Sequence, residues 1–443
     1  MKKSCFLMFI MGVFLFGICG CAGTERNSAA TGSGNKINTE TEISYDVEGY
    51  KERLQQKRVP FTDYADHYAD DVSAVIAAEY QLLHFDQAVF GEFPNTDKVS
   101  LLKADDRNIT AEESIDIVEG WLKNIGKTDG VNLETELGVL NFNIDTSGDE
   151  SVVETADGTK YPLVYPHITE LMSGEGVFLD RDDCYIVIGD DGIGEMSDGK
   201  VSRYLNENGI SARAADVLFM EQLGTEIVSG DTEELGEEVY PLINEELTIG
   251  EGADIAEKYF SQGTPYEWTE ELQSRASEVT VYQVEDVYCY EFDMTRYYCG
   301  VPVVRTESGT YQFDGNYYVA GDSKKAYVAD GESVTAYRGT NDGEPLIPLV
   351  TEEELLCLPD AVGILDENLA SQLNVSVNLV EFVYLPLGFE DSSNTDEEIF
   401  FPCWRFEGFN SVKNETMELY VDALTGDVYY YRFSPENTGY HAE

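Results

Sequence analysis

The sequence predicts an α+β protein made of tandem modules, each with a helix packed on an antiparallel sheet. The first observation is a repeated helical segment: residues 109–122 (ITAEESIDIVEGWL) align without a gap against residues 247–260 (LTIGEGADIAEKYF). The second is strand-rich sequence with glycine-containing turns, which forms hairpin patterns at residues 184–196, 326–337 and 417–433. A helix packed on each sheet would bury the apolar side of both elements.

The repeated helical segment has the same start in both copies. Thr110 precedes Glu113 by three residues, and Thr248 precedes Glu251 by three. This spacing predicts a capping box, in which each side chain accepts a hydrogen bond from a free backbone N–H of the first turn. Helix capping alone could produce part of this similarity, so the internal duplication is a hypothesis.

Further helices are expected at both ends of the chain. Residues 50–85 have apolar positions at helical spacing, and Pro60 divides them into an early polar helix and a later amphipathic helix. A third module helix is expected to begin either in residues 351–359 (TEEELLCLP), again with T-x-x-E spacing, or in residues 364–373 (ILDENLASQL).

The hairpin patterns depend on their turns, at residues 190–192, 330–331 and 425–426. Glycine supplies the positive φ that tight hairpin turns need, so alternating residues on either side predict paired antiparallel strands. The last pattern, MELYVDALTGDVYYYRF, places Tyr429 and Tyr431 on one face of its second strand.

The first residues form the most specific signal in the sequence. Lys2 and Lys3 precede an apolar run over residues 6–18, which is too short to span a bilayer as a permanent helix. Small residues then lead into Cys21, a pattern that resembles the lipobox of bacterial lipoproteins. The resemblance implies that residues 1–20 are removed and that Cys21 is lipidated; an ordinary signal peptide or an uncleaved anchor is the alternative. Several acyl chains would hold the protein on the extracytoplasmic face of the cell membrane.

A domain organisation follows from these segments. Residues 23–41 are small and polar without an apolar period, which is typical of a flexible tether. The remaining length of roughly 400 residues exceeds what one hydrophobic core usually fills. We expect a signal peptide, a tether, an N-terminal helical and α+β region, and two α+β modules, at residues 1–20, 21–44, 45–240, 241–345 and 346–435, respectively.

The charge of the chain disfavours some partners. The chain has 85 acidic and 28 basic residues and a formal charge of −57, which becomes −59 without Lys2 and Lys3. Such a surface is repelled by nucleic acid and by anionic lipid heads, so we expect no nucleic-acid partner. It would attract basic peptides, basic protein faces or Ca²⁺, although solubility of an exported protein is the simpler interpretation.

The sequence predicts no catalytic residue, no cofactor and no metal site. It contains no HExxH, G-x-S-x-G or P-loop pattern. Residues 63–71 (DYADHYADD) are interpreted as a solvated acidic helix face rather than a cation site. The loop at residues 390–398 could gather carboxylates around Ca²⁺, but it lacks the ordered spacing of an EF-hand. The cysteines beyond Cys21 include no CxxC pair and are expected to be mostly free, with a disulfide between Cys289 and Cys299 left open.

The second half of the chain carries a family resemblance. Its elements in order are an aromatic strand, the second hairpin, a helix, two strands and the last hairpin, at residues 288–304, 326–337, 364–373, 378–389, 399–409 and 417–433. Residues 402–405 (PCWR) and 420–428 (YVDALTGDV) match its most recognisable motifs. This order resembles the PepSY-like modules of membrane-tethered regulators of the YycH/YycI type. The resemblance covers roughly residues 247–433 and implies a regulatory role; those regulators use a transmembrane helix where this chain has a lipobox.

Three functional hypotheses follow. The leading one is a non-catalytic surface lipoprotein that regulates a membrane sensor or enzyme by contact, with a membrane protein or a basic peptide as its partner. The second is a lipoprotein that binds peptides or glycans, with Trp404, Tyr429 and Tyr431 as ligand-facing aromatics on an exposed sheet face. A carboxylate-based hydrolase ranks below both.

Overall fold

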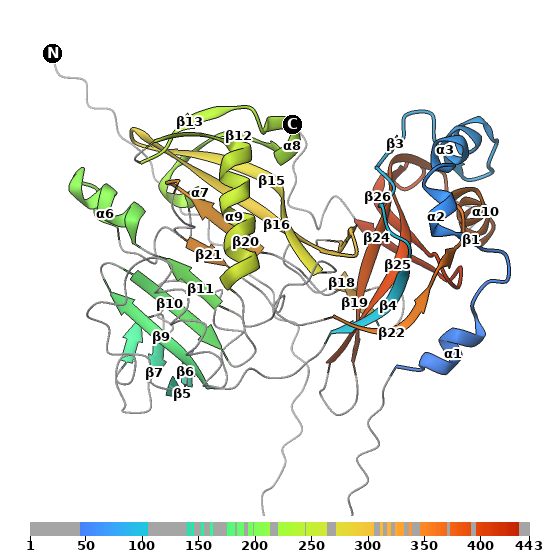
Figure 1. Ribbon diagram of the computed structural model, residues 1–443, viewed down its shortest axis with the longest axis horizontal. Coiled ribbons are helices and arrows are strands. Elements are labelled where there is room, and N and C mark those ends of the chain that lie inside the picture. Colours follow the sequence, from blue (N-terminus) through green and yellow to red (C-terminus); the bar gives the residue numbers. More distant parts are fainter. Residues whose placement is uncertain are drawn as a thin grey trace, which may run out of the picture. The chain divides into compact units, whose positions relative to one another are not determined.

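The computed structural model describes residues 45–104 and much of residues 140–433. Within the second range it leaves out residues 142, 146–151, 155–159, 163–174, 182–183, 190–193, 198, 213–219, 244, 264–271, 305–310, 313–316, 320–323, 332–335, 339–345, 370–372 and 391–395. The described residues form an α+β fold, as predicted, with two large and mainly antiparallel sheets (Figure 1). No helix among them is long and apolar enough to cross a membrane.

The first sheet, called the α9 sheet below, is built around the long hairpin of β15 (Leu272–Val284) and β16 (Val287–Tyr298). Its strands follow one another in the order β12 (Thr225–Asp231), β15, β16, β20 (Lys324–Val328), β21 (Ala336–Arg338), β11 (Gly194–Ser197), β10 (Cys184–Gly189), β9 (Glu175–Arg181) and β5 (Leu140–Asn141). The helix α9 (Ile249–Gly263) packs on β15, β16 and β20 (Figure 1). This is the predicted arrangement of one helix on an antiparallel sheet.

Helix α9 starts at the capping box that the sequence predicts. The backbone N–H of Thr248 donates to Glu251 Oε2 at 2.9 Å, and that of Glu251 donates to Thr248 Oγ1 at 3.0 Å. Gly252 allows the helix to lie close to the sheet, since a Cβ there would stand 2.6 Å from Tyr290 Cδ2. The other copy of the repeat, residues 109–122, lies outside the described residues.

The second sheet, called the α10 sheet below, is built around the hairpin of β24 (Val375–Glu390) and β25 (Asp396–Asn410). Its main strands follow in the order β18 (Tyr311–Gln312), β19 (Tyr317–Val319), β24, β25, β26 (Glu415–Asp422) and β27 (Val428–Phe433). One face is covered by the helices α2 (Phe61–Tyr64), α3 (Tyr68–Ala77) and α10 (Leu358–Asn368) (Figure 1).

Residues from the N-terminal region complete the α10 sheet. Strands β2 (Leu83–His84) and β3 (Val89–Phe90) pair in parallel with β24. Strand β4 (Val99–Ala104) pairs antiparallel with β25 and with β22 (Leu346–Glu352). Leu101 and Leu102 of β4 are fully buried in the same core as β24 and β25. Residues 45–104 and 346–433 therefore share a core, although the sequence boundaries divide them between two regions.

The remaining elements are short, and several flank these two sheets. They are α1 (Val47–Glu52), β1 (Val59–Pro60), β6 (Asn143–Asp145), β7 (Val152–Glu154), β8 (Lys160–Pro162), α6 (Lys200–Glu207), α7 (Met220–Leu223), α8 (Thr232–Leu235), β13 (Val239–Pro241), β14 (Glu246–Thr248), β17 (Val301–Pro302) and β23 (Glu354–Leu355).

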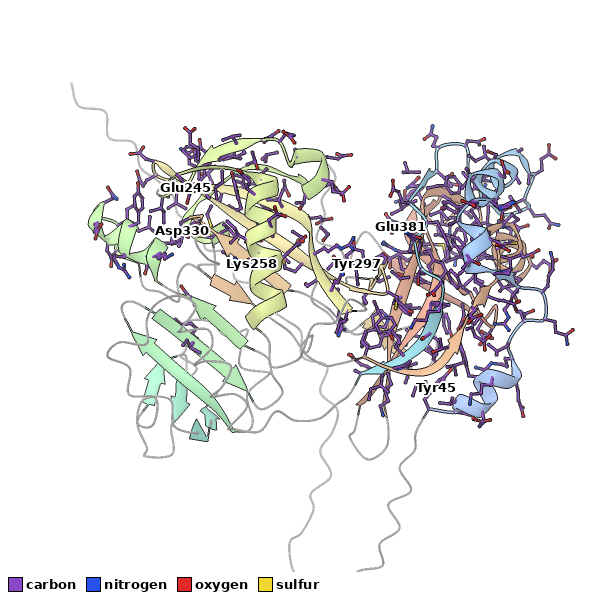
Figure 2. All side chains as sticks on the ribbon, in the orientation of Figure 1. Tyr45, Glu245, Lys258, Tyr297, Asp330 and Glu381 are labelled. Atoms are coloured by element: carbon purple, nitrogen blue, oxygen red, sulfur yellow. The ribbon has the colours of Figure 1, made fainter. Side chains whose placement is uncertain are left out.

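All three predicted hairpins are present as paired strands. Strand β10 pairs with β11, β20 with β21, and β26 with β27. In the last turn Gly426 has φ +75°, the conformation for which a glycine was expected. In the second, the backbone N–H of Gly331 donates to Glu245 Oε1, and Figure 2 shows Glu245 near Asp330.

Two helix predictions need correction. The predicted break at Pro60 is present, but the later of the two helices predicted over residues 50–85 is itself divided into α2 and α3 and ends at Ala77; Leu83 forms a strand because the edge of β24 offers it backbone partners. The third module helix starts at Leu358, within the first of its two expected segments (351–359) and before the second (364–373), but not at the T-x-x-E motif, because Thr351 lies in β22 opposite Ser100. Pro359 in its first turn fits this start, since proline has no N–H to lose there.

Candidate functional site

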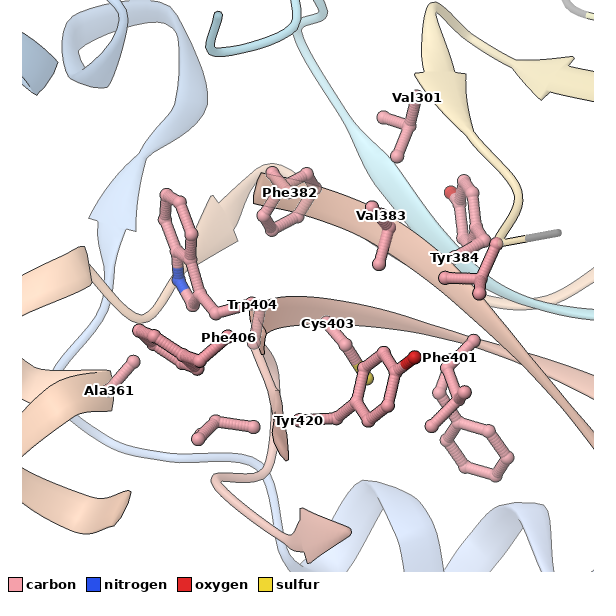
Figure 3. Close-up of a cluster of buried hydrophobic side chains, with 14 of the residues drawn as sticks. Val301, Ala361, Phe382, Val383, Tyr384, Phe401, Cys403, Trp404, Phe406 and Tyr420 are labelled. Carbon is pink, nitrogen blue, oxygen red and sulfur yellow. The ribbon is translucent and has the colours of Figure 1, made fainter. Parts of the chain in front are cut away.

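Trp404 does not face a ligand, which corrects the expectation from sequence. Its side chain is fully buried, and its Nε1–H donates to the backbone oxygen of Leu356 at 2.9 Å (Figure 3). The ring of Tyr68 stacks on the indole at 6.0 Å between centroids, and the ring of Phe382 meets it edge-on at 5.0 Å. Alternation along β25 assigned Trp404 to one face of the strand but could not show that helices α2 and α3 cover that face.

Of the two tyrosines of β27 that were expected to face a ligand, the structure describes the side chain of Tyr429 but not that of Tyr431. Tyr429 is half-buried and its ring lies 5.6 Å from that of Phe401. Burial, followed by the charge of Asp422, raises the pKa of Tyr429 well above its usual value. The backbone of Tyr431 pairs with Glu418, but its side chain lies outside the described residues. Cys21 lies outside them as well.

Asp422, at the end of β26, is a buried carboxylate with a perturbed pKa. Its side chain is fully buried, and Oδ1 accepts hydrogen bonds from the backbone N–H groups of Leu424 and Thr425 at 2.8 and 3.1 Å. The Tyr50 hydroxyl donates to Oδ2 at 2.9 Å. Burial raises the pKa of Asp422 to about 6, even though these hydrogen bonds favour the charged form. The motif YVDALTG contains the signal for this site, because an aspartate two residues before a turn commonly caps it.

A charge cluster lies on the same face of the α10 sheet as Asp422. Arg405 Nη1 donates to Glu381 at 3.0 Å, and Nη2 donates to Glu418 at 2.7 Å and to Glu407 at 3.2 Å. Burial alone would lower the pKa of Arg405, but Tyr420 and the surrounding carboxylates outweigh it and raise that pKa. These carboxylates are thus held as partners of one guanidinium.

Among the described residues, Cys289, Cys299, Cys357 and Cys403 form no disulfide bond. The expected free thiols are therefore confirmed, and Cys289 and Cys299 form no disulfide. Burial raises the pKa of Cys357 to about 11 and that of Cys403 well above its usual value. Both thiols are protonated at neutral pH, which disfavours them as nucleophiles.

The acidic segment at residues 63–71 does not form one continuous helix face. Helix α2 ends at Tyr64 and α3 starts at Tyr68, and Asp63, Asp66 and Asp70 are exposed. In the part of the chain that the structure describes, no group of three or more His, Cys, Asp or Glu side chains is placed to hold a metal ion. Residues 391–395 of the acidic loop lie outside that part.

A hollow of about 700 Å³ with a mixed polar and apolar lining, called the polar hollow below for its charged and amide side chains, is a candidate for binding a small molecule. Its lining includes Thr62, Asn95, Asp97, Lys98, Gln273 and Arg275. The Arg275 guanidinium lies 4.8 Å from the ring centroid of Tyr297 and donates to Gln273 Oε1 at 2.9 Å, so the cation is held in place. Cations, amides and hydroxyls of this kind suit a polar ligand that carries a carboxylate. Sequence patterns gave no signal for this hollow, because its residues come from distant segments.

Comparison with known proteins gives little further. No protein-family model and no curated protein matches the chain. One similar solved structure is an uncharacterised protein from Eubacterium rectale, with a TM-score of 0.40 and 13% identity over 79% of this chain and 92% of that chain. Another is the C-terminal domain of YpeB from Bacillus megaterium, with a TM-score of 0.24 and 13% identity over 74% of this chain and 99% of that chain. At TM-scores this low, neither likeness carries an argument about function.

Proposed function

We propose that this protein is a lipoprotein of the extracytoplasmic membrane face, anchored through Cys21, that regulates a membrane sensor or enzyme by protein contact and not by catalysis. Perturbed titratable groups are the usual mark of an active site. Here Asp422 is fully buried and bonded to Tyr50 and to its own turn, and the carboxylates around Arg405 bond to its guanidinium. The engagement of Asp422 and of the carboxylates around Arg405 in structural bonds is the observation that supports a non-catalytic role.

The anchor is tested by metabolic labelling with palmitate. Cells that produce the wild-type chain should incorporate label into the protein and retain it in the membrane fraction. The Cys21→Ser variant should lose both the label and the membrane association, whereas Cys299→Ser should keep both. Undiminished labelling of Cys21→Ser would rule out this anchor.

The contact role is tested by crosslinking in intact membranes, followed by purification of the protein and mass spectrometry. The formal charge of −59 favours a basic partner face, so capture should weaken as salt rises from about 50 to about 500 mM. Recovery of no membrane protein, at low salt and with the anchor intact, would contradict the regulatory role.

The polar hollow favours a second function, binding of short peptides or acidic sugars. A thermal shift at millimolar dipeptide or uronic acid would support it, and the two probe classes would distinguish the ligands. Arg275→Gln should abolish the shift, whereas Arg203→Gln, on the exposed side of α6, should retain it. Shifts that persist in Arg275→Gln would place binding elsewhere. A carboxylate-based hydrolase stays below both functions.

A further inference from the structure

The segment that follows the tether is attached to the α10 sheet at one small site. We call residues 45–55, which include α1, the clasp. At six residues, α1 is too short to be a stable helix on its own, so tertiary contacts must hold it. Tyr50 is fully buried, whereas every other residue of the clasp is half-buried or exposed. Figure 2 shows Tyr45 at the beginning of this segment, next to α1.

The polar contacts of the clasp converge on the turn between β26 and β27. Tyr50 bonds to Asp422, and Arg53 Nε lies 3.2 Å from Asp427 Oδ2. The backbone N–H of Gln55 donates to the oxygen of Leu424 at 2.9 Å, and its side-chain Nε2 donates to that of Thr425 at 2.7 Å. The clasp therefore joins the beginning of the folded chain to its last hairpin through one turn.

The clasp covers the face of β25 opposite Trp404. Cys403 and Trp404 leave the strand on opposite sides (Figure 3), and Cys403 lies directly across from Asp422 in the strand register. Cys403 and Phe401 are both buried, and the Phe401 ring lies 5.7 Å from that of Tyr45 and 6.1 Å from that of Tyr50. Removal of the clasp would uncover this face while α2, α3 and α10 still cover the other.

We propose that the clasp is a gate that opens as a unit while the α10 sheet stays folded, and that its opening uncovers Phe401, Cys403 and Asp422. Local opening costs least where few apolar groups are buried and the backbone is exposed. The clasp has one fully buried side chain, whereas β24 and β25 are paired along almost their entire length. Beyond the clasp, Arg58 bonds to Glu352 and β1 pairs with β23, so the opening should stop before Arg58.

The charges at the gate set the direction of its pH dependence. The groups that interact with Asp422 are Tyr45 and Tyr50 from the clasp, Cys403 from β25, and Asp427 and Tyr429 from the last hairpin; Arg53 of the clasp pairs with Asp427. With the clasp closed, the buried carboxyl of Asp422 has a pKa of about 6, above its value of 3.8 in water. The Tyr50 hydrogen bond by itself favours the charged form, but burial under the closed clasp favours the protonated form and is the larger effect, so a rise in pH through 6 favours opening.

The gate also has a mechanical aspect, which rests on the proposed anchoring. The tether enters the clasp directly at Tyr45, so a pull from the membrane would load the Tyr50–Asp422 contact before it loads the sheet. Movement of a partner in the membrane could therefore change the exposure of the covered face.

Thiol labelling of the full mature chain tests the gate. Cys403 reports opening of the clasp, and Cys289, buried in the α9 sheet, reports any wider unfolding. Tyr50→Phe removes one hydroxyl that bonds to a carboxylate and should speed maleimide labelling of Cys403 about tenfold, with Cys289 unchanged. Tyr240→Phe is the matched control: its hydroxyl also bonds to a carboxylate, Glu238, and the loss should alter neither rate. Equal acceleration of both thiols, or none at Cys403, would overturn the proposal.

Two further variants keep the test decisive if Tyr50→Phe folds poorly. Gln55→Ala removes only the side-chain bond to Thr425 and should speed Cys403 labelling by a smaller factor. Asp422→Asn removes the buried charge and should slow Cys403 labelling at pH 8 relative to the wild type. Slower Cys403 labelling in Gln55→Ala together with faster labelling in Asp422→Asn would also overturn the gate proposal. These rates are measured in detergent without tension, so they do not depend on lipid at Cys21, and failure of the gate is distinguishable from failure of the anchor.

Discussion

Two opposing effects set the pKa of Asp422. Its carboxylate accepts hydrogen bonds from one phenol and two backbone N–H groups, each of which stabilises the charged form. Complete burial acts in the other direction and is the larger effect, so its pKa rises to about 6. The residue thus joins three separate parts of the fold, the clasp, β26 and the final turn, and remains sensitive to pH.

The pH dependence of stability follows from that shift. Because the pKa of Asp422 is higher in the folded state than its usual 3.8, its stabilising effect is complete below pH 4 and is lost as pH rises through 6. The loss amounts to roughly 3 kcal/mol, as a shift of this size implies. Urea unfolding of the wild type and of Asp422→Asn between pH 4 and pH 7.5 measures it as the difference between the two curves. A difference that is constant with pH would contradict the assignment.

Arg405 gives a second prediction at this scale. Arg405→Met would leave the carboxylates of Glu381, Glu407 and Glu418 facing one another without a cation. Because Arg405 is largely buried, we expect a loss of about 2 kcal/mol, below the cost of breaking a fully buried ion pair. Chemical denaturation measures the loss, and Arg203→Met on exposed α6 should cost less than about 0.5 kcal/mol. Equal losses in Arg405→Met and Arg203→Met would show that the charge cluster adds nothing to the free energy of unfolding.

At the scale of elements, a capping motif predicted the structure correctly where its hydrogen-bond partners lie in the same short segment. The capping box at Thr248 and Glu251 fixed the start of α9, because both of its hydrogen bonds are local. The same T-x-x-E spacing at Thr351 failed, because β4 offers that segment a strand partner about 250 residues away in the sequence. A capping motif therefore marks a helix only where no distant strand competes for the backbone.

Two helical glycines form a matched pair of substitutions. Gly252→Ala would place a Cβ 2.6 Å from Tyr290 and should destabilise the protein by about 1–3 kcal/mol through overpacking. Gly363 lies in α10, and apart from its chain neighbours and its own helix backbone no atom lies within 4 Å of an added Cβ. Gly363→Ala should therefore be neutral or stabilise by up to about 1 kcal/mol, because alanine favours helix. Thermal unfolding compares them, and a stabilised Gly252→Ala would show that α9 does not lie this close to the sheet.

The capping box gives an independent test of the start of α9. Thr248→Ala removes the acceptor for the Glu251 N–H and should cost about 1 kcal/mol. Ser73→Ala, within α3, removes a hydroxyl that bonds to the backbone oxygen of Ala69 and should cost less than half as much. Equal shifts of the denaturant midpoint in Thr248→Ala and Ser73→Ala would show that the cap stabilises the protein no more than an ordinary side-chain hydrogen bond does.

At the scale of the whole molecule, the α10 sheet is assembled from both ends of the chain. Strand β4 supplies Leu101 and Leu102 to a core whose other members include Phe400 and Leu387. The face of the α10 sheet that carries Trp404 is covered by Phe61, Tyr64 and Tyr68. The C-terminal module suggested by the sequence therefore lacks part of its own core.

This assembly predicts complementation between fragments. Residues 346–435 produced alone should stay unfolded, because β24 and β25 lose β4 and the helices that cover Trp404. Addition of residues 45–104 should restore the near-ultraviolet circular dichroism of the buried indole. A folded 346–435 fragment with that signal would contradict the shared core.

The sequence alone determined the features that depend on neighbours along the chain. It predicted the α+β class, the three hairpins, the capping box of α9 and the need for glycine at position 426, since each follows from local periodicity or backbone geometry. Only the tertiary structure decided which faces are covered. Trp404 is buried because α2 and α3 pack on it, and Asp422, whose pKa is raised by burial, is bonded to Tyr50 from 372 residues away in the sequence. Strand alternation separates two faces, but long-range packing determines which of them water can reach.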